Sequence, residues 1–325
     1  MLKIVGVILA AMVAVSASAS FEIALILDRA TKKVYRYDPV SGAFLGSFGS
    51  FNAPTSLSIN RARNEVIVWD RDNGVNGDGI AYHYNYNTGM QTYSATALSS
   101  SISQIGFNPT GTGYISTREN VNGYYALTFG LAGGVKTMGT NAGTRFDVID
   151  TTRFAYIEGE QKVNLVDFNA STLLNSSTPG IQPTDVATGV MSAFGGTAAA
   201  ICSATGSVQL ASIGSNSISY GGVTAASGFT VISGIAPTHN GFIAVGHGPS
   251  GGTLVKLFSV GIGTSLANSY LIPQSAIATS GISDPIDVVT VVAPEPETWL
   301  AMSCGVLLCL SRRRHQFSVR HSPQT

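Results

Sequence analysis

Short strands with a period of two run along most of this 325-residue chain, and they exclude a helical fold for its body. Apolar residues alternate with polar ones over five to eight positions, and Gly, Pro, Asn, Asp or Ser separates one run from the next, which is the pattern of β-strands. Between residues 20 and 296 no segment has the apolar periodicity of a three-turn helix. We predict an all-β body whose clearest strands span residues 22–27, 33–37, 56–60, 65–69, 81–85, 124–129, 162–168, 241–245 and 253–260.

One type of turn recurs between these strands. Asp38 is followed by Gly42, Asn85 is followed by Gly89, and each pair lies between two strand-like runs. Asp and Asn cap turns with their own side chains, and glycine closes a turn at positive φ without steric strain. Both segments are therefore predicted hairpins, and Asp167 begins a third copy that lacks the glycine.

The first strand of each repeating unit begins near Pro54, Ser103, Arg145, Thr184, Val231 and Asp284. Starts that lie about 40–50 residues apart are typical of β-propeller blades. The last of these strands, from Asp284, has no partner after it, whereas the three strands in residues 22–48 lack a first one. Pairing them would close the ring and remove its exposed sheet edges.

The sequence therefore predicts a single β-propeller with six blades of four antiparallel strands. Seven blades, a pair of β-sandwiches and a β-helix are the alternatives. Residues 44–49, 54–59 and 65–70 are similar to an NHL-type propeller blade, a likeness that concerns the fold alone.

The N-terminus has the order of a secretory signal peptide. Lys3 precedes an uncharged apolar stretch, and Ala17 and Ala19 place small residues at the two positions that signal peptidase requires. The apolar stretch spans only about 18 Å as a helix, less than the ~30 Å of a bilayer core. We predict cleavage after Ala19 rather than an uncleaved anchor.

The C-terminus combines a proline motif, an apolar run and a basic cluster. Pro294-Glu295-Pro296 forms a stiff extended segment. Residues 299–310 follow as a predicted membrane helix, and the arginines after it favour the cytoplasmic side. The predicted membrane anchor includes Trp299, Leu300, Leu307, Leu308 and Leu310, and the stop-transfer cluster is Arg312, Arg313 and Arg314.

This ordered tail resembles the PEP-CTERM sorting domain. The resemblance implies that an exosortase cleaves near Pro294-Glu295-Pro296, in a Gram-negative-type bacterium that makes exopolysaccharide. It implies a membrane-anchored intermediate that is later released to the cell surface or matrix, with the exosortase and the secretion machinery as partners. The expected organisation is a signal peptide (1–19), a propeller (20–292), a sorting signal (293–314) and a cytoplasmic tail (315–325), with the closing strand ending at about Val291.

Charge and motifs narrow the function of the body. Residues 20–296 hold 13 basic and 17 acidic residues, a net charge of −4, which gives no basic surface for nucleic acid. The nucleophile elbow, the zinc-protease motif and the P-loop are absent, and the carboxylates are scattered. Cys202 is the only cysteine of the body and is expected to be a buried, inert thiol. His83 is expected at an ordinary strand position, and His239 and His247 in turns or loops.

A candidate calcium loop lies after one strand. Asp70, Asp72, Asn76 and Asp78 supply the oxygen ligands that Ca²⁺ prefers, interleaved with glycines. A plain long hairpin is the alternative, because Gly74 stands where such a loop needs its first acid and no bidentate Glu follows.

We predict from these features an exported, non-enzymatic binding or structural module associated with exopolysaccharide or biofilm. The alternatives are an extracellular propeller enzyme that acts on glycans as a hydrolase or lyase, which would need acids, His or Tyr converging in the central channel, and a scaffold for protein–protein contacts.

Overall fold

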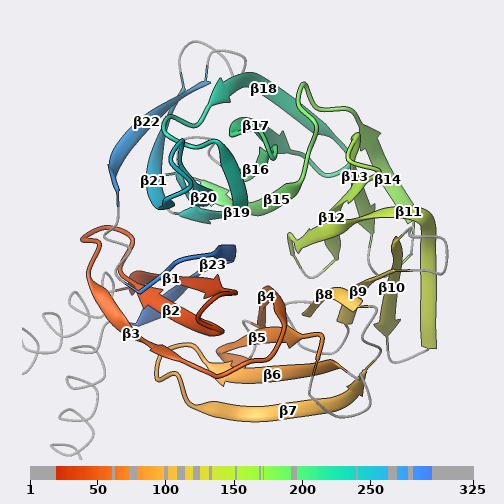
Figure 1. The fold of residues 1–325 in the computed structure, drawn as a ribbon. Helices are drawn as coiled ribbons and strands as arrows, with labels where there is room; N and C mark the ends of the chain where they lie inside the picture. The colour runs from red at the N-terminus through yellow and green to blue at the C-terminus, as the bar shows by residue number, and fades with distance from the viewer. Residues whose placement is uncertain are drawn as a thin grey trace, which may run out of the picture. The chain divides into compact units, whose positions relative to one another are not determined.

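The structure is a computed structural model that consists of β-strands joined by turns (Figure 1). It describes residues 20–60, 63–72, 79–98, 102–107, 114–119, 125–131, 134–150, 152–167, 170, 172–191, 196–238, 241–262, 269–276 and 281–294. The chain divides into two compact units, one of which is Ile23–Val291 and the other Met1–Glu22 with Val292–Thr325. The fold described below is that of Ile23–Val291.

The sheet that joins the two ends of the chain has the strand order β23-β1-β2-β3. The Arg29 N–H, just after β1, donates to the Asp284 carbonyl, just before β23, at 2.9 Å, so the two strands are antiparallel. The predicted closure of the ring by the last strand is confirmed. Its strands are β1 (Ser20–Asp28), β2 (Lys33–Tyr37), β3 (Phe44–Phe48) and β23 (Pro285–Pro294).

Three further sheets each consist of four consecutive antiparallel strands. The first holds β4 (Pro54–Asn60), β5 (Glu65–Asp70), β6 (Gly79–Asn85) and β7 (Gln91–Leu98). The second holds β15 (Asp185–Met191), β16 (Gly196–Cys202), β17 (Ser207–Ile213) and β18 (Ile218–Ala225). The third holds β19 (Val231–Thr238), β20 (Gly241–His247), β21 (Thr253–Ile262) and β22 (Ser269–Ala276). The strand starts predicted near Pro54, Thr184 and Val231 are thus confirmed.

The fifth sheet has seven strands, and it corrects the prediction of six four-stranded blades. It holds β8 (Ile102–Phe107), β9 (Tyr114–Glu119), β10 (Tyr125–Leu131), β11 (Gly134–Val148), β12 (Arg153–Glu158), β13 (Lys162–Asp167) and β14 (Thr172–Ser177). β11 is 15 residues long, and Arg145 lies inside it rather than at a strand start. Its first part pairs with β10 and its last part with β12. The described residues therefore form five sheets, because two expected units share this uninterrupted strand.

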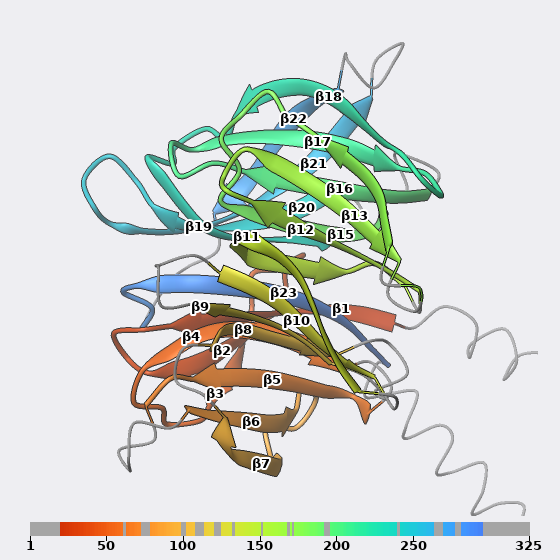
Figure 2. The same ribbon diagram turned by 90° about the vertical axis from the view of Figure 1, so that its right-hand side faces the viewer.

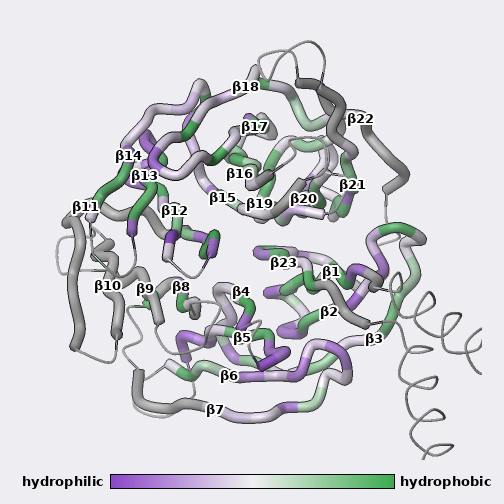
Figure 3. The backbone as a smooth tube through the Cα atoms, turned by 180° about the vertical axis from the view of Figure 1, so that it is seen from behind, coloured by the Kyte–Doolittle hydropathy of each residue, from purple (hydrophilic) through white to green (hydrophobic). Residues whose placement is uncertain are grey.

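The sheets surround a central axis and pack face to face with their neighbours (Figures 1 and 2). Apolar clusters fill the spaces between neighbouring sheets, as between β15–β18 and β19–β22 and between β19–β22 and the β1 sheet. Strands covered on both faces read as continuous apolar runs rather than alternating ones. All six residues of β5 are buried, and Figure 3 shows such apolar (green) stretches along several strands.

The predicted Asp/Asn–Gly hairpins are confirmed and share one geometry. The Gly42 N–H donates to the Asp38 carbonyl at 2.8 Å, and the Gly89 N–H donates to the Asn85 carbonyl at 2.7 Å. Both glycines have positive φ, 72° and 73°. The side chains of Asp38 and Asn85 each accept backbone N–H groups within their own turn, which explains why these residue types occur there.

Candidate functional site

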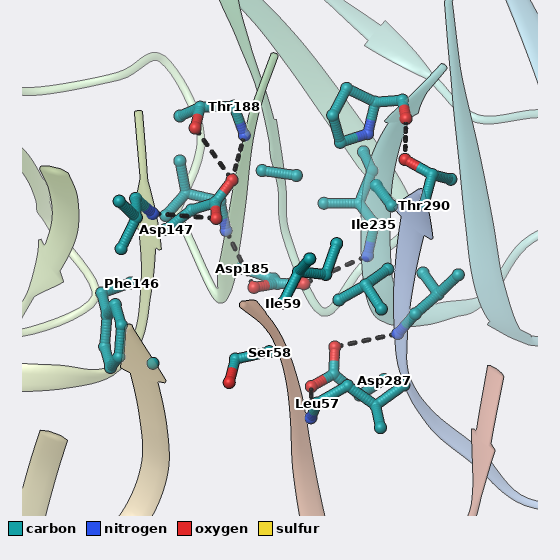
Figure 4. A pocket seen from close by; sticks show the side chains of 18 of the residues that line it. Leu57, Ser58, Ile59, Phe146, Asp147, Asp185, Thr188, Ile235, Asp287 and Thr290 are labelled. Carbon is teal, nitrogen blue, oxygen red and sulfur yellow. Dashed lines mark hydrogen bonds between the residues drawn. The ribbon is translucent and has the colours of Figure 1, made fainter. Parts of the chain in front are cut away.

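Six strands line the central axis, in the order β23, β4, β8, β11, β15 and β19, because the seven-stranded sheet contributes two of them. Contacts at successive positions show that β19 and β23 run in the same direction: Gly234 lies beside Asp287, and Pro237 beside Thr290. A cavity of about 60 Å³ lies among all six strands (Figure 4). It has room for a few water molecules or one small ionic or polar group.

Three aspartates of these strands bind the next strand around the ring. Asp287 of β23 accepts a hydrogen bond from the Leu57 N–H of β4 at 2.7 Å. Asp185 of β15 accepts one from the Ile235 N–H of β19 at 3.1 Å. Asp147 of β11 accepts two from Thr188 of β15, from its N–H at 2.5 Å and its hydroxyl at 2.8 Å.

Each of these aspartates also accepts the N–H of the residue that follows it, always a valine, at 2.8–2.9 Å. One carboxylate oxygen is thus held by its own strand and the other by the neighbouring strand. The axial strands of neighbouring sheets are not paired with each other by backbone hydrogen bonds. The three aspartate side chains supply hydrogen bonds between these strands instead. We call these three contacts the axial clasps.

Two uncharged side chains make the same kind of link. Gln104 of β8 donates to the Phe146 carbonyl at 3.1 Å and accepts from the Phe146 N–H at 3.0 Å. The hydroxyl of Thr290 donates to the Pro237 carbonyl. With the axial clasps, these contacts connect most neighbouring pairs of strands around the axis.

Arg145 crosses the channel. Its strand, β11, stands three positions around the ring from β23, yet Nη1 lies 2.8 Å from Asp287 Oδ2 and Nη2 lies 3.1 Å from the Ile286 carbonyl. The two side chains are 15% and 6% exposed. Burial lowers the pKa of Arg145, but the carboxylates of Asp287 and Asp185 outweigh that effect and raise it. Arg145 therefore stays charged and joins β11 to β23 across the axis.

Asp185 is a buried acid of the channel with a raised pKa. Burial raises its pKa from the ordinary 3.8 to about 7, Arg145 lowers it, and the nearby charge of Asp287 raises it further. A carboxyl of this kind in a cavity is a candidate acid or base. Both of its oxygens, however, already accept backbone N–H groups. Cys202 is buried and free, and burial, followed by the charge of Asp185, raises its thiol pKa, as expected for an inert thiol.

Sequence reasoning missed the axial clasps because it treated the carboxylates as scattered. A usable signal was present: Asp147, Asp185 and Asp287 each precede a valine near a predicted strand start. Only the ring brings these three positions, far apart in sequence, to one axis.

The candidate calcium residues are placed only in part. Asp70 is buried, and its carboxylate accepts the N–H groups of Asn52 and Ala53 at 2.7 Å and that of Asp72 at 3.3 Å. Asp70 therefore holds the segment that leads into β4. Asp28 does the same before β23, accepting the N–H groups of Ser283 and Asp284.

Asn76 and Asp78 lie outside the described residues. In the part of the chain that the structure describes, no three His, Cys, Asp or Glu side chains are grouped as metal ligands.

Two histidines are described. His83, in β6, is buried, and its Nδ1 lies 3.1 Å from Glu65 Oε2, while the Thr92 hydroxyl donates to Glu65 Oε1 at 2.7 Å. This polar contact lies within one sheet, which confirms an ordinary strand position. His247 ends β20, with Nε2 3.5 Å from Asp284 Oδ1. His239 lies outside the described residues.

The residues of the signal peptide and nearly all of the sorting tail also lie outside the described residues. They are Ala17, Ala19, Glu295, Pro296, Trp299, Leu300, Leu307, Leu308, Leu310, Arg312, Arg313 and Arg314. Pro294 is the last residue of β23, so this strand is three residues longer than the predicted end at Val291. Proline is tolerated there because β23 lies at an edge of its sheet.

Among the described residues there is no helix with the length and apolar character needed to span a bilayer.

Comparison with known proteins identifies the fold and nothing finer. No protein-family model matches the chain, and no curated protein sequence matches it. A chain in the crystal structure of a nidogen/laminin complex is similar, with a TM-score of 0.56 and 10% identity over 83% of this chain and 98% of that one.

Two more solved structures give the same result. A protein from Lactobacillus plantarum has a TM-score of 0.54 and 12% identity over 84% of this chain and 99% of that one. The WD40 repeats of RRP9 have a TM-score of 0.51 and 11% identity over 80% of this chain and 82% of that one. WD40 repeats form β-propellers. The body of this chain is therefore an all-β protein with a β-propeller fold.

Proposed function

We propose that this chain is an exported, non-enzymatic binding or structural module of the cell surface or extracellular matrix, processed at Pro294-Glu295-Pro296 by an exosortase. One observation supports the proposal: the closing strand β23 ends at Pro294, so the motif begins at the last residue of that strand. Cleavage within or after the motif leaves β23 in place, and with it the sheet β23-β1-β2-β3.

The start of the folded chain supports the same proposal. β1 begins at Ser20, the residue after the predicted signal-peptidase site at Ala19. Both processing sites thus flank the folded strands without removing any of them. A ring that keeps all its strands after both cleavages is suited to export followed by release.

The channel supports a structural rather than a catalytic use of its acids. Every carboxylate oxygen of Asp147, Asp185 and Asp287 accepts at least one hydrogen bond from the protein. A catalytic carboxylate needs an oxygen within reach of substrate. Because all of their oxygens accept hydrogen bonds that join strands, these aspartates are suited to holding the ring rigid as a support for binding loops.

One observation favours an alternative, an extracellular propeller enzyme that acts on glycans. Asp185 and Asp287 border the same cavity, and the pKa of Asp185, raised by burial to about 7, suits a general acid. In that case Asp185→Asn would abolish glycan cleavage in a hydrolase or lyase assay while the protein remained folded.

The proposed function is tested by mass spectrometry of both termini of the protein recovered from fractionated cultures. We expect an N-terminus at Ser20, a C-terminus near Pro294-Glu295-Pro296, and retention in the polysaccharide matrix. A variant with Pro294→Ala, Glu295→Ala and Pro296→Ala should keep its tail and stay with the membrane. Equal recovery as free protein from polymer-deficient and wild-type cultures would refute the association with exopolysaccharide.

A further inference from the structure

The pair of neighbouring axial strands β4 and β8 differs from the other five pairs. The axial clasps, together with Gln104 and Thr290, link each of those five pairs by a side-chain hydrogen bond. On β4, the hydroxyls of Ser56 and Ser58 are buried and have no hydrogen-bond partner among the described residues. We call the contact between β4 and β8 the serine seam.

Both serines face β8. A Cβ built on Gly106 of β8 would stand 3.8 Å from the Cβ of Ser58, so these two residues lie side by side. Ser56 lies two residues before Ser58 on the same strand, and its side chain therefore points to the same face of the sheet. Trp69, which pairs with Ser56, donates to the Ile102 carbonyl of β8 at 2.6 Å. The two contacts show that β8 runs in the same direction as β4.

Ser56 stands in the position from which other axial strands make their links. It is level with Gln104, two residues before Gly106, and Gln104 bonds both backbone groups of Phe146 on the next strand. A serine side chain is shorter than that of aspartate or glutamine. Its hydroxyl therefore leaves unbridged the gap between axial strands that Asp287 and Gln104 bridge at other seams.

The closed seam does not recover the free energy lost in burying these groups. Ser56 is 1% exposed, and its hydroxyl gives up hydrogen bonds to water without gaining one from the described protein groups. Oδ1 of Asn60, two residues beyond Ser58 on the same face, is also buried without such a partner. Separation of β4 from β8 lets water reach all three groups, whereas separation at an axial clasp breaks hydrogen bonds to a buried carboxylate. Opening therefore costs less at the serine seam than at the axial clasps.

We propose that the ring opens locally at the serine seam, where β4 and β8 part at the axis while the Trp69–Ile102 hydrogen bond holds the two sheets together further out. The seam borders the axial cavity, because Ser58, Gln104 and Gly106 line that cavity (Figure 4). Opening at the seam gives water and small solutes a route to the cavity and leaves the axial clasps closed. This inference is independent of the proposed function, since it uses residues of the ring alone.

The test measures how fast a thiol at the seam reacts in the folded protein. The full chain with Cys304→Ala and Cys309→Ala carries Ser56→Cys, and the buried Cys202 remains as a reference in the same molecule. Labelling of both thiols by iodoacetamide is followed by mass spectrometry at increasing urea concentration, and each rate is divided by that of the unfolded protein. Global unfolding exposes both thiols equally, so an excess rate at position 56 reports local opening.

Without urea, we expect the thiol at position 56 to react at least about tenfold faster than Cys202, and the two rates to converge as urea brings global unfolding. Equal rates at all urea concentrations would overturn the inference. Ala236→Cys is the matched control, because Ala236 is 2% exposed and packs between β19 and the β1 sheet, at a seam that Thr290 closes. Its thiol should react as slowly as Cys202, and a rate equal to that at position 56 would also overturn the inference.

A second variant supplies a longer side chain at the seam. Ser58→Asn places an amide where it can reach the backbone of β8, as Gln104 reaches that of β11. Combined with Ser56→Cys, it should slow labelling at position 56 at least about threefold while the rate at Cys202 stays the same. Unchanged labelling at position 56 would refute the assignment of the opening to the missing hydrogen bonds. A faster rate at Cys202 would show that the asparagine does not fit, and the comparison of positions 56 and 236 would then decide alone.

Discussion

Replacing Arg145 by methionine tests whether the ion pair across the channel stabilises the ring. Arg145→Met removes the bonds to Asp287 and to the Ile286 carbonyl, and it leaves a carboxylate that is 6% exposed without its counter-charge. Removing one partner of a buried pair costs about 3–5 kcal/mol. Because Asp287 keeps the N–H groups of Leu57 and Val288, we expect a loss of about 3 kcal/mol, at the lower end of that range.

The assay is urea unfolding followed by the fluorescence of Trp69, which is buried and donates to the Ile102 carbonyl at 2.6 Å. A loss of about 3 kcal/mol corresponds to a melting temperature lower by about 6–12 °C in a unit of this size. Arg29→Met is the matched control. Arg29 also lies 2.8 Å from an aspartate, Asp284, but its side chain is 64% exposed, so we expect a change below about 1 kcal/mol.

The double variant Arg145→Met/Asp287→Asn separates the lost attraction from the unpaired charge. We expect it to be less destabilised than the sum of the single variants, with a coupling of about 2 kcal/mol. If Arg145→Met were no more destabilising than Arg29→Met, the reasoning about the channel would be wrong.

Three further predictions follow from buried acids and from the closing strand. Because burial raises the pKa of Asp185 to about 7 in the folded protein, above the ordinary 3.8, the folded state binds this proton more tightly. Stability should therefore fall as pH rises from about 4 to about 7 and level off above, and Asp185→Asn should remove that fall in pH-dependent urea melts. Asp70→Ala leaves three N–H groups without their acceptor, so it should lower the free energy of unfolding by about 3 kcal/mol in the same urea melts. For the parent protein, a melting temperature that is unchanged by EDTA and by added Ca²⁺ would refute the calcium loop. Deleting residues 285–325 should give a chain that binds a hydrophobic dye and is cleaved rapidly by protease, because it lacks β23, whereas deleting residues 295–325 should leave both measurements at the values of the full chain.

Local chemistry explains how much of the fold could be predicted. The alternation of apolar residues and the turn residues at Asp38, Gly42, Asn85 and Gly89 act over a few positions, so the strands and hairpins could be read directly. The closing strand was predictable for a similar reason, since a lone last strand and three first strands leave unpaired edges.

The division between neighbouring units could not be read in the same way. Glycine and asparagine near the middle of β11 suggest a break, but the strand continues through them from Gly134 to Val148. Pairing with β10 on one part and β12 on the other supplies long-range hydrogen bonds that outweigh a weak local preference.

The sequence by itself determined the class of fold and most of the strands, because these depend on residues that are close together in the chain. Only the tertiary structure decided the composition of the channel. Arg145, Asp185 and Asp287 belong to different sheets and are separated by 40 to more than 100 residues. Closure of the ring brings them within hydrogen-bonding or electrostatic range. Because they are buried there, these charged residues, which are usually found on protein surfaces, interact strongly and join the strands around the axis.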